Sequence, residues 1–517
     1  MIFRKRELCM TLIVETGNGK VKGFKENIGD KGVTKFLGIP YCQSPVGELR
    51  FAPPKPHPGW TGVFEALNYS KISIQPPPDP SLSILDDPYN IGEDCLTLNI
   101  YVPGEPFSKV DSLKKSVMVW IHGGGLLSGA SSWQMYNPTN LALKGDVIVV
   151  TINYRLGALG FLAVGSEEST GNFGILDQLA ALRWIKDNIA TFGGNPENIT
   201  IFGESAGSMS VSTLVALPKA KGLFNRAICE SGAPVTMDFE KAMGLKEQFL
   251  ATLSLKDDKD LLSVSAADIL SVQNDISTQV GYDISLPFLP IVDGILIKEH
   301  PYETYKKGQE NPVDLLIGTN RDEMNLFSLS IPDLAKLSFE MIPGLFAKKP
   351  ELISGYSDVL PDSLIDRYRD LLDESVSPLK LWCTLATDVA FRIPSICIAK
   401  AHSSNHGVDD KVKTYCYRFE WVSSFLSGNL GSCHGLEIPF VFDLLDHPFI
   451  GMFAGADRPE SKGLSEFMTS AWYNFAKTGI PDGHWDAYDE SSQKIMIINA
   501  DSKCAKDDLN EFTKLWE

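Results

Sequence analysis

The chain has 517 residues, of which 44% are hydrophobic and 22% are charged, and this ordinary composition excludes a disordered or collagen-like chain. Its 65 acidic and 47 basic side chains give a formal net charge of −18. Such a surface repels nucleic acid and anionic lipid, which bind basic surfaces, so we expect neither nucleic acid nor a membrane as a partner.

The N-terminus begins like a secretory signal peptide, but only about six apolar residues follow its basic start before Glu15. The most apolar stretch of the chain, 146–165, contains Asp146 and Arg155, so no membrane span is expected. The nine cysteines form no C-x-x-C pair, which suits a reducing compartment better than a disulfide scaffold. We therefore expect a cytoplasmic protein with residues 1–11 as an N-terminal extension.

Short β-rich apolar runs alternate with helical segments along the chain. The runs are nearly continuous in hydrophobicity, as expected for strands buried on both faces. The clearest helix covers 176–192 and ends at Gly193-Gly194. This order predicts an α/β fold with a mostly parallel central sheet flanked by helices. The predicted strands are 117–121, 147–154, 199–202, 227–229, 314–318 and 415–419.

The domain organisation follows from the absence of any boundary in this pattern. A chain of this length would ordinarily suggest about three domains. No internal repeat or linker separates the segments, however, and we predict a single domain over 12–517. Within it, residues 237–400 are irregular and helical, as expected for a cap-like insertion over a site.

The segment around Ser205 is the most informative in the chain. A predicted strand leads into Gly203-Glu204-Ser205-Ala206-Gly207, and a predicted helix follows. A G-x-S-x-G sequence between a strand and a helix is typical of a nucleophilic serine held in a strained turn. A side chain at either glycine would collide with a neighbouring strand or helix. We therefore predict Ser205 as the nucleophile.

A second glycine-rich segment suggests where negative charge is stabilised. The predicted strand 117–121 runs into His122 and three glycines. Acyl transfer needs backbone N–H donors aimed at the developing oxyanion, and glycines let the main chain approach it closely. We predict that the amides of Gly124, Gly125 and Ala206 form this oxyanion hole. No G-x-x-x-x-G-K-[ST] sequence supports a phosphate-binding loop instead.

A serine nucleophile needs a histidine base and a carboxylate that orients it, and both should follow Ser205 in the order known for such folds. For the acid, Asp322 and Glu323 lie just past a predicted strand, with Asp293 as the competitor. Spacing favours His434, in a glycine-flanked loop, among the possible bases. The other candidates are His300, His402, His406, His447 and His484.

These residues together resemble the type-B carboxylesterase family, the α/β-hydrolases that include the cholinesterases. FGGNPENITIFGESAG (192–207) matches the nucleophile signature of the family, and EDCLTLNIYVP (93–103) matches its second signature. Among the branches of this family, the sequence most resembles the bacterial para-nitrobenzyl-esterase-like one. Further matching segments lie at 36–51, 171–189, 222–232 and 286–294.

The resemblance implies roles for individual residues. Its G-x-x-x-D-E pattern makes Glu323 the acid, and its G-x-x-H-x-x-E pattern makes His434 the base. It also implies Ser231 as a serine that supports the histidine, and Arg50 with Glu93 as a structural ion pair. Candidate walls of the acyl pocket are Leu126, Leu127 and Phe288.

Three positions depart from the family pattern. Met324 stands where the family has glycine after the acid, which could shift the loop of Glu323. Cys95 matches a cysteine that is bridged in secreted relatives, but its partner position holds Ser73, in agreement with a reducing compartment. No tryptophan lies between Trp60 and Trp120 to bind a quaternary ammonium group, so choline esters are not expected.

The sequence thus predicts an α/β-hydrolase that cleaves carboxylic esters of short to medium acyl chains through an acyl-enzyme. The partners are a small-molecule ester and water, and no metal or cofactor is needed. The same triad would serve amides, carbamates or thioesters, which is the alternative within enzymes. The remote alternative is a non-catalytic adhesion or scaffold protein of the same family.

Overall fold

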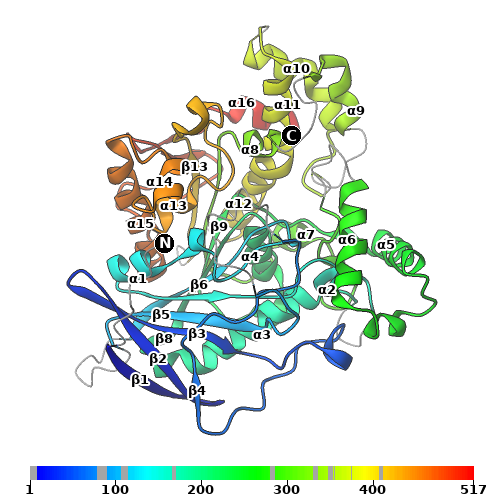
Figure 1. Cartoon of the computed structure of the whole chain (residues 1–517). Coiled ribbons are helices and arrows are strands. Elements are labelled where there is room, and N and C mark those ends of the chain that lie inside the picture. Colours follow the sequence, from blue (N-terminus) through cyan, green and yellow to red (C-terminus); the bar gives the residue numbers. More distant parts are fainter. Residues whose placement is uncertain are drawn as a thin grey trace.

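Figure 1 shows the fold of the chain in a computed structural model. The structure describes residues 9–77, 90–105, 114–165, 170–279, 286–329, 336–346, 353, 355–373, 375–406 and 412–517.

One large sheet of 13 strands runs through the molecule. Its order is β1-β2-β3-β5-β7-β6-β8-β9-β12-β13-β14-β15, and β4 pairs with β2. The strands from β7 to β14 are parallel, whereas the β1–β7 end and the β14–β15 edge pair antiparallel. The predicted mostly parallel central sheet is confirmed. The strands are β1 (Cys9–Thr16), β2 (Gly19–Ile28), β3 (Lys31–Pro40), β4 (Val63–Glu65), β5 (Thr97–Pro103), β6 (Lys115–Ile121), β7 (Ile148–Ile152), β8 (Gly194–Glu204), β9 (Arg226–Glu230), β12 (Asp314–Asn320), β13 (Thr414–Phe419), β14 (Lys494–Ile498) and β15 (Lys503–Lys506). A separate pair is formed by β10 (Met237–Asp238) and β11 (Ile291–Val292).

Helices cover both faces of this sheet, which explains the continuous apolar runs. Along β6, Val117, Val119 and Ile121 enter one apolar cluster, whereas Met118 and Trp120 enter the other. Helices α3 and α4 pack on the first face, and α1 and α15 on the second. The longer helices are α1 (Thr139–Gly145), α3 (Phe173–Asn188), α4 (Ala206–Ala216), α5 (Phe239–Thr252), α6 (Ala266–Gln279), α10 (Ile365–Leu372), α11 (Pro378–Thr387), α12 (Ile393–His406), α14 (Pro448–Ala454) and α15 (Glu460–Thr478). The shorter ones are α2 (Gly157–Phe161), α7 (Pro301–Lys306), α8 (Met324–Ser328), α9 (Ile342–Phe346), α13 (Ile438–Val441) and α16 (Asn510–Thr513).

The region 237–400, predicted as an irregular helical insertion, contains the helices from α5 to α11 and most of α12. Several of them lie at the right and the top of the view in Figure 1, away from β1–β4. The region is not wholly helical, because β12 of the central sheet passes through it. At the N-terminus β1 begins at Cys9, so residues 9–11 of the expected extension pair with β2.

Element boundaries differ slightly from the sequence pattern. The helix expected over 176–192 begins at Phe173, and its last turn, 189–192, is a 3₁₀ turn. Gly193 ends it at φ 89°, a left-handed conformation that glycine adopts freely. The strand expected over 147–154 covers only Ile148–Ile152, and the side chain of Asn153, just past its end, accepts the N–H of Ser131 at 2.8 Å.

One helical run, Pro378–His406, is long and apolar enough to cross a membrane by length and composition. It consists of α11, a π turn at Asp388–Arg392, and α12. Its apolar window is 83% buried within the structure. Such burial is typical of a core helix, so the run is no argument for a membrane span.

A buried ion pair ties the end of β7 to α3. Arg155 donates to both carboxylate oxygens of Asp177, from Nη2 at 2.7 Å and from Nε at 2.8 Å. Its Nη1 also donates to the carbonyl oxygens of Arg50 and Ala52, both at 2.9 Å. Removal of one member would leave the other charge buried without a partner.

We predict that Asp177→Asn lowers the free energy of unfolding by about 3–5 kcal/mol, because Arg155 would keep its charge in the core. Urea unfolding of the purified variant measures this loss. The matched control is Asp486→Asn, which breaks the exposed pair with Lys494 and should leave the midpoint nearly unchanged. Equal midpoints for the two variants would contradict the structural role of Asp177.

Candidate active site

The turn between β8 and α4 presents Ser205 at the carboxyl end of the sheet. Ser205 has φ 57° and ψ −125°, a strained conformation for a residue with a side chain. A Cβ at Gly203 would lie 2.5 Å from the carbonyl oxygen of Ile121, and one at Gly207 only 2.0 Å from it. The backbone of β6 therefore requires glycine at both positions, as the sequence pattern predicts.

The glycine loop after β6 runs directly beside Ser205. A Cβ on Gly123 would lie 3.1 Å from the Cβ of Ser205 and 3.0 Å from Oε2 of Glu204. Gly124 has φ 104°, and a Cβ there would meet the carbonyl oxygen of Ser128 at 2.2 Å. Within the described part of the chain, the backbone amides of Gly124, Gly125 and Ala206 have no hydrogen-bond acceptor. They are therefore free to donate to a ligand.

His434 and Glu323 come from different strand ends and meet in the interior. Nδ1 of His434 lies 2.7 Å from Oε2 of Glu323 in a buried hydrogen bond. The other oxygen of Glu323 accepts the backbone N–H of Asn320 at 2.7 Å. Glu323 follows β12, and His434 lies in the loop after β13, so adjacent parallel strands deliver the pair.

Met324 does not displace the loop of the acid. It is buried at the start of α8, with only 1% of its surface exposed. Its backbone N–H donates to Oγ1 of Thr387 at 3.2 Å. The larger side chain is thus accommodated in the core while Glu323 keeps its contact with His434.

The second nitrogen of His434 lies beside the carboxylate of Glu204. Nε2 lies 3.0 Å from Oε1 of Glu204, without the alignment of a hydrogen bond. The hydrogen bonds found among the described residues include none between Ser205 Oγ and His434. The rings of Phe327 and Phe391 pack against the imidazole at 5.0 and 4.8 Å between centroids. Sequence reasoning missed this contact of Glu204, although the residue lies inside the G-x-S-x-G segment.

The charges around His434 shift its proton affinity. Burial lowers the pKa of His434, but the carboxylates of Glu204 and Glu323 outweigh burial and raise the pKa to about 9. Burial raises the pKa of Glu204 to about 7, against the opposing charge of His434. These carboxylates therefore stabilise the imidazolium that forms when His434 takes up a proton.

A further group of buried polar side chains, Asn320, Glu437 and Ser231, lies next to Glu323. Nδ2 of Asn320 donates to Glu437 at 2.5 Å and to the carbonyl oxygen of Cys433 at 2.7 Å. Burial raises the pKa of Glu437 to about 8, with Glu204 and Glu323 adding to the effect. Ser231 Oγ donates to Glu437 at 3.5 Å, so the structure places Ser231 against Glu437 and not directly against His434. Glu437 is the last residue of the G-x-x-H-x-x-E pattern, which could have identified it.

The other candidate acids have different partners. Asp322 pairs with Lys380 at 2.8 Å and with Arg321 at 2.9 Å, and its carboxylate also accepts the N–H of Ser432 at 3.1 Å. Asp293 accepts the N–H of Thr170 at 3.0 Å and the amide of Asn172 at 3.2 Å. Both carboxylates therefore hold loops in place.

The remaining candidate histidines also lie elsewhere. His300 and His447 cap the N-termini of α7 and α14 with their side chains, and His484 is exposed. His402 and His406 lie on α12, beside Glu310. Of the six histidines considered from sequence, His434 is the one that contacts a candidate acid of the pattern.

The three candidate pocket residues differ in exposure. Leu126 and Phe288 are almost wholly buried, at 1% and 0% exposed, and Phe288 packs against Phe249. Neither side chain is accessible to a substrate in this conformation. Leu127 is partly buried, and the side chain of Leu286 approaches to 3.2 Å from the position of a Cβ on Gly125. Leu286 therefore lies beside the glycine loop, although it was not among the candidate pocket residues named from the sequence.

Two structural expectations concern the N-terminal third of the chain. Cys95 is a free, buried thiol, and its neighbour is Ser73, which lines the same small cavity and hydrogen-bonds to it. The two side chains are thus neighbours, as the expected correspondence of Ser73 to the partner position requires. Arg50 and Glu93 form a two-pronged ion pair at 2.6 and 2.9 Å, as expected for a structural role.

Comparisons with known proteins agree over nearly the whole chain. The profile of a family described as "Carboxylesterase family" matches residues 10–516. The para-nitrobenzyl esterase of Bacillus subtilis (strain 168) is 38% identical over 96% of this chain and 97% of its own length. Carboxylesterase 1C of Mus musculus is 35% identical over 94% of this chain and 89% of its own length.

Solved structures show the same similarity in three dimensions. The carboxylesterase EST55 of Geobacillus stearothermophilus matches with a TM-score of 0.84 and 35% identity, over 98% of this chain and 100% of that one. A structure of PNB esterase matches with a TM-score of 0.85 and 36% identity, over 98% of this chain and 99% of that one.

We predict that Glu204→Gln lowers the pKa of His434, because a carboxylate that favours the imidazolium form is lost. NMR titration of ¹⁵N-histidine-labelled protein, with His434 assigned through His434→Gln, measures the shift. Asp322→Asn is the control, since that carboxylate pairs with Lys380 and Arg321. The electrostatic account fails if Glu204→Gln leaves the titration midpoint unchanged.

Proposed function

Because the chain belongs to the carboxylesterase family and is a carboxylic-ester hydrolase with an α/β-hydrolase fold, we propose that Ser205, His434 and Glu323 form its catalytic triad. The observation that carries the proposal is the 2.7 Å hydrogen bond between His434 and Glu323, at the sheet edge that also presents Ser205 in a strained turn. The order serine, acid, histidine along the chain is the one expected for this fold.

In the acylation step, Ser205 Oγ attacks the ester carbonyl carbon while Nε2 of His434 takes the hydroxyl proton. Glu323 holds Nδ1–H of the imidazole, so that Nε2 carries the free electron pair. The tetrahedral intermediate collapses, the bond to the alcohol oxygen breaks, and His434 returns the proton to the departing alcohol. Ser205 is then esterified with the acyl group.

Deacylation repeats the same chemistry with water. His434 takes a proton from the water, whose oxygen attacks the acyl carbon, and Ser205 leaves as the alcohol when its oxygen regains the proton. The products are the carboxylic acid and the free enzyme. Every proton transfer passes through His434, so this route calls for no metal or cofactor.

The oxyanion of both intermediates is stabilised by the amides of Gly124, Gly125 and Ala206. Support comes from their lack of an acceptor within the described residues and from the position of the glycine loop beside Ser205. Removal of one such donor typically costs about 3–4 kcal/mol of transition-state stabilisation. Glycine conformations at Gly124 and Gly125, with φ 104° and 63°, aim the backbone without a side chain in the way.

Glu204 contributes a second charge to the same proton transfer. When His434 takes the proton from Ser205 it becomes an imidazolium, and Oε1 of Glu204, 3.0 Å from Nε2, stabilises that cation. Among the described residues, no hydrogen bond joins Nε2 to Ser205 Oγ in the resting enzyme. Hydrogen bonds of an active site are often loose before substrate binds and tighten in the reacting complex.

We propose neutral esters of short to medium acyl chains as substrates and the cytoplasm as the location. The net charge of −18 favours uncharged substrates over anionic ones. The free thiol of Cys95 beside Ser73 is consistent with a reducing compartment.

Ser205→Ala is expected to lower kcat for para-nitrophenyl esters by at least about 10⁴-fold, because the nucleophile is lost. Glu323→Gln should cost about 10³- to 10⁴-fold, since the imidazole loses the carboxylate that orients it. Asp322→Asn is the matched control and should retain activity. A large loss in Asp322→Asn with none in Glu323→Gln would show that Asp322, and not Glu323, is the acid of the triad.

The acyl preference is tested by kcat/KM for para-nitrophenyl esters of increasing acyl length. We expect a maximum at short to medium chains and a decline toward long ones. A profile that keeps rising to long-chain esters would contradict the proposed preference and indicate a lipase. Matched amides, measured beside the esters, should react far more slowly, and comparable rates would contradict the preference for esters.

A further inference from the structure

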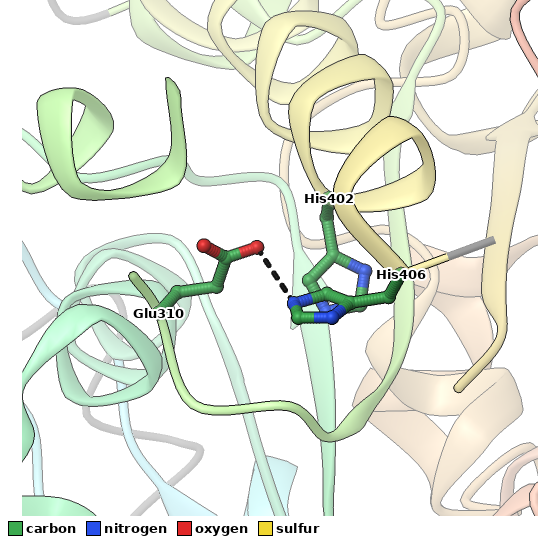
Figure 2. A group of neighbouring side chains, drawn as sticks. All are labelled: Glu310, His402 and His406. Atoms are coloured by element: carbon green, nitrogen blue, oxygen red, sulfur yellow. Dashed lines mark hydrogen bonds and ion pairs between the residues drawn. The ribbon is translucent and has the colours of Figure 1, made fainter. Parts of the chain in front are cut away.

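A second cluster of polar side chains lies at the amino ends of β12 and β13, opposite the ends that lead to Glu323 and His434. His402 and His406 are four residues apart on α12 and therefore share one face of the helix. Glu310 reaches them from the segment between α7 and β12. Figure 2 shows the carboxylate of Glu310 directed at His406, whose ring is tilted by 59° against that of His402. None of these residues has a role in the proposed ester hydrolysis.

The distances suit a shared ligand. One possible ligand atom from each residue lies within 4.8 Å of the other two. Glu310 Oε1 and His406 Nε2 are already 3.0 Å apart. Ligand atoms about 2.0–2.1 Å from a tetrahedral zinc ion lie about 3.3 Å from each other, so small side-chain rotations would complete the set.

Two buried atoms of the cluster make no well-aligned hydrogen bond within the described structure, although the backbone of Val313 lies close to the ring of His402. They are Nε2 of His402 and Oε2 of Glu310. His402 is 0% exposed, and Glu310 is 4% exposed. An unpartnered buried nitrogen and carboxylate oxygen are costly, and a bound cation would satisfy both.

Neighbouring residues hold the side chains of His402 and Glu310 by hydrogen bonds, as is usual around metal ligands. Nδ1 of His402 lies 2.7 Å from Oγ1 of Thr414, and donation of Nδ1–H there leaves the lone pair on Nε2. Nδ2 of Asn405 donates to Glu310 Oε1 at 3.1 Å and to the carbonyl oxygen of Tyr305 at 2.6 Å. The carboxylate is thus held in place toward the helix.

We propose that Glu310, His402 and His406 bind one divalent transition-metal ion of the zinc type. Two imidazoles and one carboxylate are a donor set that zinc accepts, with a fourth position left for water. Carboxylate-only ligands, which calcium and magnesium prefer, are not what this cluster offers.

The position of the site assigns it a stabilising role. Glu310 precedes β12 and Thr414 begins β13, whereas Glu323 and His434 follow the other ends of these strands. A strand of the length of β12 separates the two sites by about 20 Å. The ion would tie the C-terminal turn of α12 to the segment before β12, and it would take no part in the chemistry at Ser205.

The test uses untagged enzyme freed of metal with a chelator and then dialysed against micromolar Zn²⁺. We expect one equivalent of zinc, a Co²⁺ visible spectrum typical of tetrahedral coordination, and a higher Tm with Zn²⁺. Glu310→Gln and His406→Gln should each weaken binding at least about tenfold and abolish the rise in Tm, because each removes one of three ligands.

Two control variants test whether the ion binds at this cluster and not elsewhere. His484→Gln removes an exposed histidine and Ser205→Ala alters the catalytic site, and both should keep the full equivalent of zinc. Glu310→Gln and His406→Gln should also retain esterase activity, which shows that they fold. The proposal is overturned if the wild-type enzyme takes up no zinc, or if both ligand variants bind it as tightly as the wild type. In that case Glu310 and His406 form only an ion pair.

Discussion

The close contact between the end of β6 and the turn after β8 is the constraint on which the catalytic geometry depends. The carbonyl oxygen of Ile121 occupies the space that a side chain at Gly203 or Gly207 would need. Because the two backbones touch there, the glycine loop that continues β6 passes beside Ser205. The proposed nucleophile and oxyanion donors thus follow two neighbouring parallel strands whose spacing is set by the sheet itself.

The same sheet also places His434, which becomes a cation when it takes up a proton, among carboxylates. Adjacent strands β12 and β13 lead to Glu323 and His434, and Glu204 approaches the opposite nitrogen of the imidazole. Burial excludes the water that would screen these charges, so each affects the proton of the other strongly. An enzyme that must form an imidazolium at each step benefits from such surroundings.

The two ends of β12 and β13 serve different purposes. At the carboxyl ends, loops carry the reacting groups, as is general for open α/β sheets. At the amino ends, Glu310 and His402 lie in the interior and bear on how α12 packs against the sheet. The metal ion proposed there would act on stability, because it would bridge α12 and the segment before β12, which are far apart in the chain.

Much of this protein followed from local patterns. The strand, G-x-S-x-G turn and helix around Ser205 are contiguous, so their geometry is written in one short segment. The glycine loop after β6 is equally local, and the family pattern was sufficient to select Glu323 over Asp322. The pocket was the weakest point, because the burial of Phe288 depends on Phe249 and other residues distant in sequence.

What the sequence by itself determined is the fold class and the strained turn that presents Ser205, the proposed nucleophile, since these depend on hydrophobic order and on short-range backbone sterics. Only the tertiary structure decided that Nε2 of His434 faces Glu204, that Ser231 supports Glu437, and that Glu310 joins two histidines of α12. The physical reason is that such contacts join side chains from separate strands and helices. Their distances and charges are set by packing, which no spacing along the chain records.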